Sequence, residues 1–392
     1  MSIVQAVLSS EPDKTPAPEL KARLRRFRDA LYERNISAAL ITTDVNVHYL
    51  SGFTGNDSAL LITPENKFLL TDFRYVEEAE STAPGWKAII EKNKKKVGDK
   101  VEVVVPRGLM EKAGYLAKKL RIRKLAVEPG DMRIADLRVL RKAARGVKIK
   151  PEDAMVGELR LCKSDWEVEQ IEKALRIQEN CFLKLCAALK VGMPEREVAA
   201  KLRYLMVQAG ADDQAFDCMF QVGSNSSLPH GRPTTRALSG DAVILMDWGA
   251  KRTGYHSDLT RTFFMGTIPP TLRKIHGIVL EAQQAAIAKI APGVATADVD
   301  KAARDVIVKA GYDKEFGHST GHGLGLQIHE APWLSARSKE KLSAGMVITV
   351  EPGIYIPGVG GVRMEDDILV TPAGHRVLSR LKKGLRWNGG NE

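Results

Sequence analysis

Apolar positions in the first part of the chain alternate between the spacing of helices and the runs typical of buried strands. Leu20, Leu24, Phe27 and Leu31 recur every three or four residues, which predicts an amphipathic helix over residues 20–35. Strands alternating with helices are typical of an α/β layer domain, which we expect to end near residue 155. The other predicted elements are strands at 38–41, 58–62, 67–70, 101–105 and 124–127 and helices at 108–120 and 134–145.

A second unit begins near residue 159. Ser164 and Glu167 have the spacing of a capping box, which predicts a helix from there to about residue 189. Pro194 and Gly210 bracket the next helix, with Pro at its start and Gly after its end. Helices are also expected at 275–290 and 297–310, and the glycine-rich, β-branched segment 316–377 indicates strands. The chain therefore divides into a loose arm (1–17), a first domain (18–155) and a second domain (156–392).

Composition indicates an ordinary globular protein. The chain has 392 residues, of which 44% are hydrophobic and 27% charged, enough for two domains. Four scattered cysteines without a C-x-x-C pair favour free thiols in a reducing compartment. No apolar run reaches the length of a spanning helix, and the first 18 residues lack the apolar core of a signal peptide. We therefore expect a cytoplasmic protein that does not insert into a membrane.

Positive charge is concentrated in one segment. The formal net charge is +11, and residues 101–150 alone carry 14 Lys or Arg against five Asp or Glu. The simpler interpretation is a solvated basic face on the helices at 108–120 and 134–145. A nucleic-acid-binding surface is the alternative.

Two strand-like segments, 242–249 and 255–264, flank the turn Lys251–Gly254. Asp247 and Asp258 are equally far from the centre of this turn, so we expect them to face each other directly across a hairpin. Asp247 follows an apolar run, which favours burial. Two buried, opposed carboxylates repel each other unless a cation lies between them.

The same geometry occurs a second time. Segments 347–355 and 362–370 are strand-like, and Glu351 and Glu365 each lie seven residues from Gly358 in the loop between them. They too should face each other across a hairpin. Two opposed acidic pairs on apolar strands favour a metal site more strongly than one.

A histidine-rich segment supplies further candidates. His318, His322 and His329 surround a glycine-rich turn, and a glycine on each side of His322 argues against a helix there. Residues 324–330 alternate as a strand would. Three histidines in such a turn favour a functional role.

Four carboxylates and one imidazole suit two divalent ions bridged by shared carboxylates. Oxygen-rich ligation with a single histidine favours Mn²⁺, with Co²⁺, Zn²⁺ and Fe²⁺ as alternatives, and the absence of a thiolate argues against structural zinc. Paired ions lower the pKa of a bridging water and polarise a carbonyl. This chemistry is that of amide hydrolysis.

With these candidate residues, the chain resembles the pita-bread-fold metallopeptidases: Xaa-Pro aminopeptidase, prolidase and, more distantly, methionine aminopeptidase. The segment HSTGHGLGLQIHE at 318–330 is similar to the signature of the proline-directed branch, and NSSLPH at 225–230, SDLTRT at 257–262 and EPGIY at 351–355 also fit it. YLSGFTG at 49–55 resembles the N-terminal domain of creatinase and prolidase relatives. The resemblance implies an α/β, creatinase-like N-terminal domain followed by a pita-bread catalytic domain.

The resemblance also implies roles for individual residues. Glu351 would be both a ligand and the general base, and Glu365 would bridge the two ions. The implied metal ligands are Asp247, Asp258, His322, Glu351 and Glu365. The implied substrate contacts are His230 and His329, which would orient the peptide and stabilise the intermediate, with His318 and Arg363 touching substrate or ligands. None of these positions departs from the pattern, which argues against creatinase itself and against relatives that have lost the ligands.

The expected activity is that of an Xaa-Pro aminopeptidase, which removes an N-terminal residue that precedes proline by means of a hydroxide bridging two ions. Prolidase, restricted to Xaa-Pro dipeptides, is the close alternative. A non-enzymatic relative that binds nucleic acid through residues 101–150 is a distant one. The resemblance further implies a homodimer.

Overall fold

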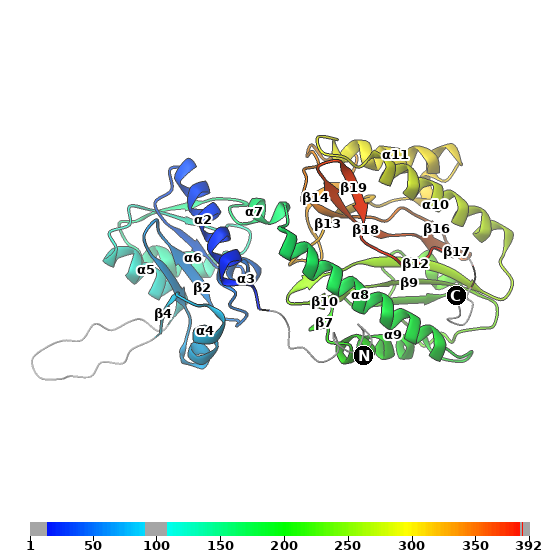
Figure 1. Ribbon diagram of the computed structural model, residues 1–392, viewed down its shortest axis with the longest axis horizontal. Coiled ribbons are helices and arrows are strands. Elements are labelled where there is room, and N and C mark those ends of the chain that lie inside the picture. The colour runs from blue at the N-terminus through cyan, green and yellow to red at the C-terminus, as the bar shows by residue number, and fades with distance from the viewer. Residues whose placement is uncertain (1–13, 91–107, 385, 387–392) are drawn as a thin grey trace, which may run out of the picture. The chain divides into compact units, whose positions relative to one another are not determined.

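The computed structural model describes residues 14–90, 108–384 and 386. It forms two compact units, one of residues 14–160 and one that takes in the described residues from Leu161 onward. Figure 1 shows the helices and strands of each unit. The strand expected at 101–105 lies outside the described residues, as does most of the arm expected at 1–17.

The N-terminal unit is built on a mixed six-stranded sheet with the order β4-β3-β2-β1-β5-β6. Alternate residues of the central strands, such as Leu40, Leu61 and Leu70, pack against helices α5 and α6 in one buried cluster. The strands are β1 (Ala39–Ile41), β2 (Ala59–Ile62), β3 (Lys67–Leu70), β4 (Lys87–Ile89), β5 (Lys124–Val127) and β6 (Lys148–Pro151). The helices are α2 (Ala17–Glu33), α3 (Asp44–Ser51), η1 (Phe73–Tyr75), α4 (Val76–Thr82), α5 (Leu109–Lys119), α6 (Ile134–Ala143) and α7 (Gly157–Leu161).

The patterns of this unit predict helices α2, α5 and α6 and strands β1, β2, β3 and β5, but not helices α3 and α4 or strands β4 and β6. Helix α2 buries Leu20, Leu24, Phe27 and Leu31, the four positions whose spacing predicted it. Helix α3 has only eight residues, too few for an amphipathic period to stand out, and strands β4 and β6 are partly exposed. Five of the six basic side chains of α5 and α6 are exposed, namely Lys118, Lys119, Arg138, Arg141 and Lys142. The sixth, Lys112, is buried and donates to the carbonyl oxygen of Thr71.

The second unit consists of two halves with the same plan, each a helix pair followed by an antiparallel sheet. In Figure 1, α8 and α9 lie on one side and α10 and α11 on the other, with the sheets between them. Helices α8 and α9 share a core with strands β8, β9 and β12, whereas α10 and α11 share one with β15 and β18. The sheet orders are β11-β10-β7, β12-β9-β8, β14-β13-β15-β18-β19 and β16-β17.

These elements have the following bounds. The helices are α8 (Asp165–Ala188), α9 (Glu195–Gln208), η2 (Gly223–Ser227), α10 (Pro270–Lys289), α11 (Thr296–Lys309) and η3 (Asp313–Glu315). The strands of the first half are β7 (Asp213–Gln214), β8 (Met219–Val222), β9 (Ala242–Trp248), β10 (Ala250–Arg252), β11 (Tyr255–His256) and β12 (Leu259–Met265). Those of the second half are β13 (Gly321–Gly323), β14 (Glu330–Leu334), β15 (Val347–Val350), β16 (Gly353–Ile356), β17 (Gly360–Arg363), β18 (Asp366–Thr371) and β19 (Gly374–Val377).

Helix punctuation in this unit follows the sequence signals. Both hydrogen bonds of the capping box between Ser164 and Glu167 are present at the start of α8. Pro194 precedes α9, and Gly210 after its end has a φ of 92°. The expected strand through 324–330 is wrong: β13 ends at Gly323 and β14 starts at Glu330, and the residues between them form a loop. Leu324 and Leu326 are buried although they lie in a loop and not in a strand. Their alternation in the sequence gave the pattern of a strand without strand pairing.

The expected pairing of Asp247 with Asp258 is also wrong. Asp247 pairs with Thr260, because the hairpin turns at Thr253 and Gly254, whose φ angles of 53° and 78° suit a two-residue turn. The centre of the turn thus lies one residue later than expected, so the residue opposite Asp247 is two positions later in the chain, Thr260 instead of Asp258. A shift of two keeps the side chain on the same face. Asp258 therefore lies diagonal to Asp247 on one face of the sheet rather than directly opposite.

The expected pairing of Glu351 with Glu365 is confirmed. Val350 pairs with Asp366 on one side and Gly353 pairs with Arg363 on the other. Both ladders have the same register, and that register places Glu351 across from Glu365.

The described helices include none with the length and apolar character needed to cross a bilayer. All four cysteines are free thiols.

Candidate metal centre and substrate pocket

One pocket of the second unit, with a volume of about 460 Å³, gathers the nine site residues expected from the sequence. Its volume is in the range of small-ligand sites. These nine are His230, Asp247, Asp258, His318, His322, His329, Glu351, Arg363 and Glu365. The remaining lining residues are Phe216, Asp217, Met219, Pro229, Arg232, Ser319, Ile328 and Trp333.

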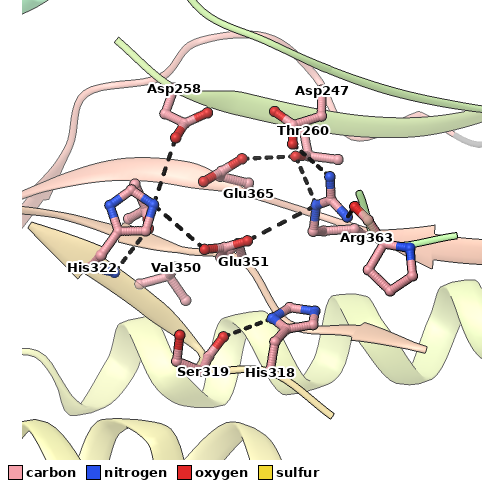
Figure 2. A network of polar contacts seen from close by, with 12 residues as sticks. Asp247, Asp258, Thr260, His318, Ser319, His322, Val350, Glu351, Arg363 and Glu365 are labelled. Atoms are coloured by element: carbon pink, nitrogen blue, oxygen red, sulfur yellow. Dashed lines mark hydrogen bonds and ion pairs between the residues drawn. The ribbon is translucent and has the colours of Figure 1, made fainter. Parts of the chain in front are cut away.

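Asp258, His322 and Glu365 form the centre of the pocket floor. Each offers a ligand atom, and these atoms all lie within 4.8 Å of one another. The His322 Nε2 atom is 3.7 Å from an oxygen of Asp258 and 3.6 Å from an oxygen of Glu351 (Figure 2). The three central side chains are almost fully buried. Strand β13, the end of the β11–β12 connection and the β17–β18 connection bring them together.

The hydrogen bond at Nδ1 of His322 determines which of the two ring nitrogens carries the proton. Its Nδ1 is 3.0 Å from the carbonyl oxygen of Gly323, which can only accept, so Nδ1 carries the proton. Burial lowers the pKa of His322 to about 4, so the ring is neutral near pH 7. Nε2 therefore points a lone pair at two carboxylate oxygens. Three electron-rich atoms in this arrangement require a cation or a proton between them.

The carboxylates crowd one another. Burial raises the pKa of Asp258 well above its usual value, and the charges of Glu365 and Asp247 raise it further. Burial and the charge of Glu351 also raise the pKa of Glu365 well above its usual value. Burial raises the pKa of Glu351 to about 8, although the positive Arg363 opposes the shift. Without a cation, this cluster favours holding protons.

Two buried oxygens of the cluster, Oδ1 of Asp247 and Oδ1 of Asp258, lack a hydrogen-bond partner. Buried polar atoms are nearly always paired, and an unpaired carboxylate oxygen is costly. Oxygen and imidazole donors with free lone pairs are what a divalent ion such as Mn²⁺ requires. The residues present therefore fit a metal centre.

Arg363 neutralises one side of this acidic floor. Its Nη2 donates to Asp247 at 2.5 Å and its Nε to the Thr260 hydroxyl at 3.1 Å. Thr260 in turn donates to Glu365 at 2.7 Å. Sequence reasoning assigned Thr260 no role, yet it joins Arg363 to a carboxylate (Figure 2). The sequence contained a sign of this role, because residues two apart on a strand share a face and Thr260 is two residues from Asp258.

The other histidines lie around the opening. The Nε2 atom of His318 is 2.9 Å from the Tyr355 hydroxyl, which also accepts from Arg363 at 2.8 Å. Burial lowers the pKa of His318 to about 4, and the charge of Arg363 contributes. His329 stacks on Trp333 with ring centroids 6.2 Å apart. Partial burial lowers the pKa of His329, and neighbouring His230 lowers it further.

Comparison with known proteins places this pocket in a family. The model of "Metallopeptidase family M24" matches residues 169–372, and that of "Creatinase/Prolidase N-terminal domain" matches residues 23–162. The chain is a member of metallopeptidase family M24. Its second unit is the pita-bread catalytic domain of a metallopeptidase.

Relatives of this M24 chain match it over nearly its whole length. The "Uncharacterized peptidase YqhT" of Bacillus subtilis is 36% identical, covering 93% of this chain and 99% of the relative. The "Xaa-Pro dipeptidase" of Pyrococcus horikoshii is 34% identical over the same shares.

Solved structures agree with the fold. An "Xaa-Pro dipeptidase from Bacillus anthracis" is 35% identical with a TM-score of 0.87, covering 94% of this chain and 99% of that one. An "X-Pro aminopeptidase from Thermotoga maritima" is 32% identical with a TM-score of 0.82, covering 91% and 99%. This M24 chain is thus similar to proteins described both as dipeptidase and as aminopeptidase.

Proposed function

We propose that this metallopeptidase hydrolyses the bond between an N-terminal residue and a following proline. The observation that carries the metal-dependent part is the His322 lone pair directed at Asp258 and Glu351 among carboxylates with unpaired oxygens. The proline preference is supported by the similarity to the Xaa-Pro peptidases named above.

In this proposal, five residues hold two divalent ions. Asp247 and Asp258 lie on one sheet face, and His322, Glu351 and Glu365 approach from the other half of the domain. Bound ions supply a lowered pKa for the attacking water and polarise the scissile carbonyl. An oxygen-rich set with one histidine favours Mn²⁺, with Co²⁺, Zn²⁺ and Fe²⁺ as alternatives.

The remaining roles belong to side chains of the pocket. A carboxylate oxygen of Glu351 takes the proton of the attacking water, as a general base within reach of it must. His230 and His329 line the opening, where they orient the peptide and stabilise the charge that develops on the carbonyl oxygen. Arg363 holds Asp247 through its 2.5 Å hydrogen bond, and His318 supports Arg363 through the Tyr355 hydroxyl.

Of the two substrate ranges, we propose an aminopeptidase that accepts peptides longer than two residues. The dipeptidase is the second candidate, and the names of the Pyrococcus horikoshii and Bacillus anthracis proteins favour it. A nucleic-acid-binding role is less well supported, because the complete set of carboxylates and histidine serves no purpose in it.

A panel of four peptides with added Mn²⁺, the dipeptide Ala-Pro among them, tests the proposal. Ala-Pro-Ala should release alanine, Ala-Ala-Ala should react far more slowly, and N-acetylated Ala-Pro-Ala should be resistant because it lacks a free amino terminus. Cleavage of Ala-Pro but not Ala-Pro-Ala would assign the dipeptidase instead. If mass spectrometry finds no cleavage of either Ala-Pro or Ala-Pro-Ala, the proposal is wrong.

A further inference from the structure

His230 reaches the pocket from a loop and not from a helix or strand. Strand β8 ends at Val222, the short helix η2 ends at Ser227, and the next strand begins at Ala242. His230 is exposed to solvent and lies midway along this stretch. Its placement over the metal centre therefore depends on what holds the loop 222–236.

The first anchor is Glu195, the first residue of helix α9, which is fully buried. One of its carboxylate oxygens accepts from the Val222 backbone at 2.7 Å and from the Asn225 side chain at 3.0 Å. The other accepts from the backbone and the hydroxyl of Thr234, at 2.8 Å and 2.6 Å. One carboxylate thus ties both ends of the loop together.

The second anchor is Gln221, a buried residue of β8. Its amide nitrogen donates to the carbonyl oxygens of Leu228 at 2.7 Å and Gly231 at 3.1 Å. A Cβ at Gly231 would lie only 2.2 Å from this nitrogen, so any larger residue there would displace the Gln221 amide. Gln221 therefore holds the chain on both sides of His230.

A third contact joins the loop to the acidic floor. Arg363, which donates to Asp247, also donates to the carbonyl oxygen of Pro229 at 3.2 Å. The carbonyls of residues 228, 229 and 231 are consequently all fixed, and the backbone of His230 has little freedom between them.

We propose that Glu195 and Gln221 are positioning residues that set His230 for the peptide substrate. This inference rests on the proposed function, since it concerns the residue that orients the substrate there. The residues described as lining the pocket include neither Glu195 nor Gln221, so both act through the loop. A reacting group displaced by about 1 Å can lose about a hundredfold in rate, which is why such a distant anchor matters.

Glu195→Gln is the main variant, because it keeps the size of the side chain while an amide NH₂ replaces one accepting oxygen. In either orientation of the new side-chain amide at position 195, its NH₂ group faces the donors at one end of the loop, those of Val222 and Asn225 or those of Thr234, and these donors lose their acceptor. We expect kcat/KM for Ala-Pro-Ala to fall by about ten- to a hundredfold, the range typical of lost supporting contacts around an active site. Gln221→Met, which keeps the length and removes both donated bonds, should have an effect in the same direction.

A double-mutant cycle separates positioning from general damage. In a His230→Ala background, Glu195→Gln should lower kcat/KM by less than about twofold, since the group it positions is gone. A loss of active enzyme through misfolding would lower kcat/KM by the same factor in both backgrounds. That equal fall would overturn the inference.

Hydrogen exchange of the full, metal-loaded chain gives a readout independent of catalysis. Glu195→Gln should speed exchange in residues 222–236 and leave the segment 347–365 unchanged. Glu128→Gln is the matched control, because Glu128 is a buried carboxylate with four hydrogen bonds in the N-terminal unit. It should leave exchange in residues 222–236 unchanged.

The two proposals fail separately. If the wild-type chain cleaves neither Ala-Pro nor Ala-Pro-Ala, the proposed function is wrong, whatever the loop does. If exchange over 222–236 is the same in Glu195→Gln as in wild type, the anchoring inference is wrong, whatever the chain cleaves.

Discussion

Two buried carboxylates, one in each unit, are held in opposite ways. Glu128 in the N-terminal unit accepts from the Thr42 backbone at 2.7 Å, from the backbone and hydroxyl of Thr43 and from the Asn46 amide. Asp258 in the catalytic unit has one oxygen without a partner, and its neighbours include four other carboxylates. A satisfied carboxylate stabilises the local fold, whereas a crowded and unsatisfied one indicates a site for a cation.

The difference is not one of burial. Glu128 is 8% exposed and Asp258 is 4% exposed, and each lies next to a strand, Glu128 directly after β5 and Asp258 directly before β12. What differs is the supply of donors. Glu128 faces the backbone at the start of helix α3, where free N–H groups are available, and Asp258 faces acids and a histidine lone pair.

The largest expected effect comes from Asp258→Ala. Removing this ligand should abolish stoichiometric metal binding and lower peptidase activity by about a thousandfold or more, because several kcal/mol of transition-state stabilisation depend on the ions. The metal-free variant should be at least as stable as metal-free wild type, since a crowded charge has gone. Elemental analysis and urea unfolding measure the two effects. Retention of the full metal complement by the variant would contradict this assignment.

Glu128→Ala should behave in the opposite way. It leaves the buried amide of Asn46 and the half-buried backbone N–H groups of Thr42 and Thr43 without their acceptor, at a cost of about 3 kcal/mol to the N-terminal unit. The metal content should not change. Hydrogen exchange at helix α3 reports the lost stability, and a variant as protected there as wild type would show that Glu128 is dispensable.

The smallest effect is a pH dependence of the metal-free chain. Burial raises the pKa of Glu351 from its ordinary 4.5 to about 8, so the folded state holds a proton that the unfolded state has lost. Stability must therefore fall as pH rises, by about 1–2 kcal/mol between pH 6.5 and 8. The buried histidines with pKa values of about 4 act in the opposite direction, but only below pH 6.5.

Urea unfolding of the chelator-treated chain at several pH values measures this trend. Saturating Mn²⁺ should abolish or reverse it, because an ion stabilises the charged carboxylate. Stability of the metal-free chain that rises with pH across this window would contradict the crowding of the cluster.

Local signals in the sequence carried much of this picture. Pro194, Gly210 and the Ser164–Glu167 capping box mark helix ends through short-range geometry, and all nine expected site residues line one pocket. The Glu351–Glu365 register could be predicted because the loop between them is short and symmetric.

What could not be predicted depends on turn geometry and on contacts distant in sequence. Asp247 pairs with Thr260 because Thr253 adopts a left-handed conformation that β-branched residues rarely take, so the turn centre was placed one residue too early. The bond from Arg363 to Asp247 spans 116 residues, and the anchoring of the His230 loop by Glu195 spans about 30. No periodicity encodes such pairs.

The hairpin formed by β16 and β17 has a consequence for how this enzyme can be altered. Glu351 and Glu365 lie between two ladders of equal register, so the β15–β18 ladder holds them in place from the side away from the turn. The tip, with Gly358 at a φ of 76° and Val359 44% exposed, is not needed to align them. Insertions are best tolerated at exposed tips of this kind. Residues 357–359 are therefore where we expect a label or an affinity tag to be accommodated without disturbing the chemistry seven residues away.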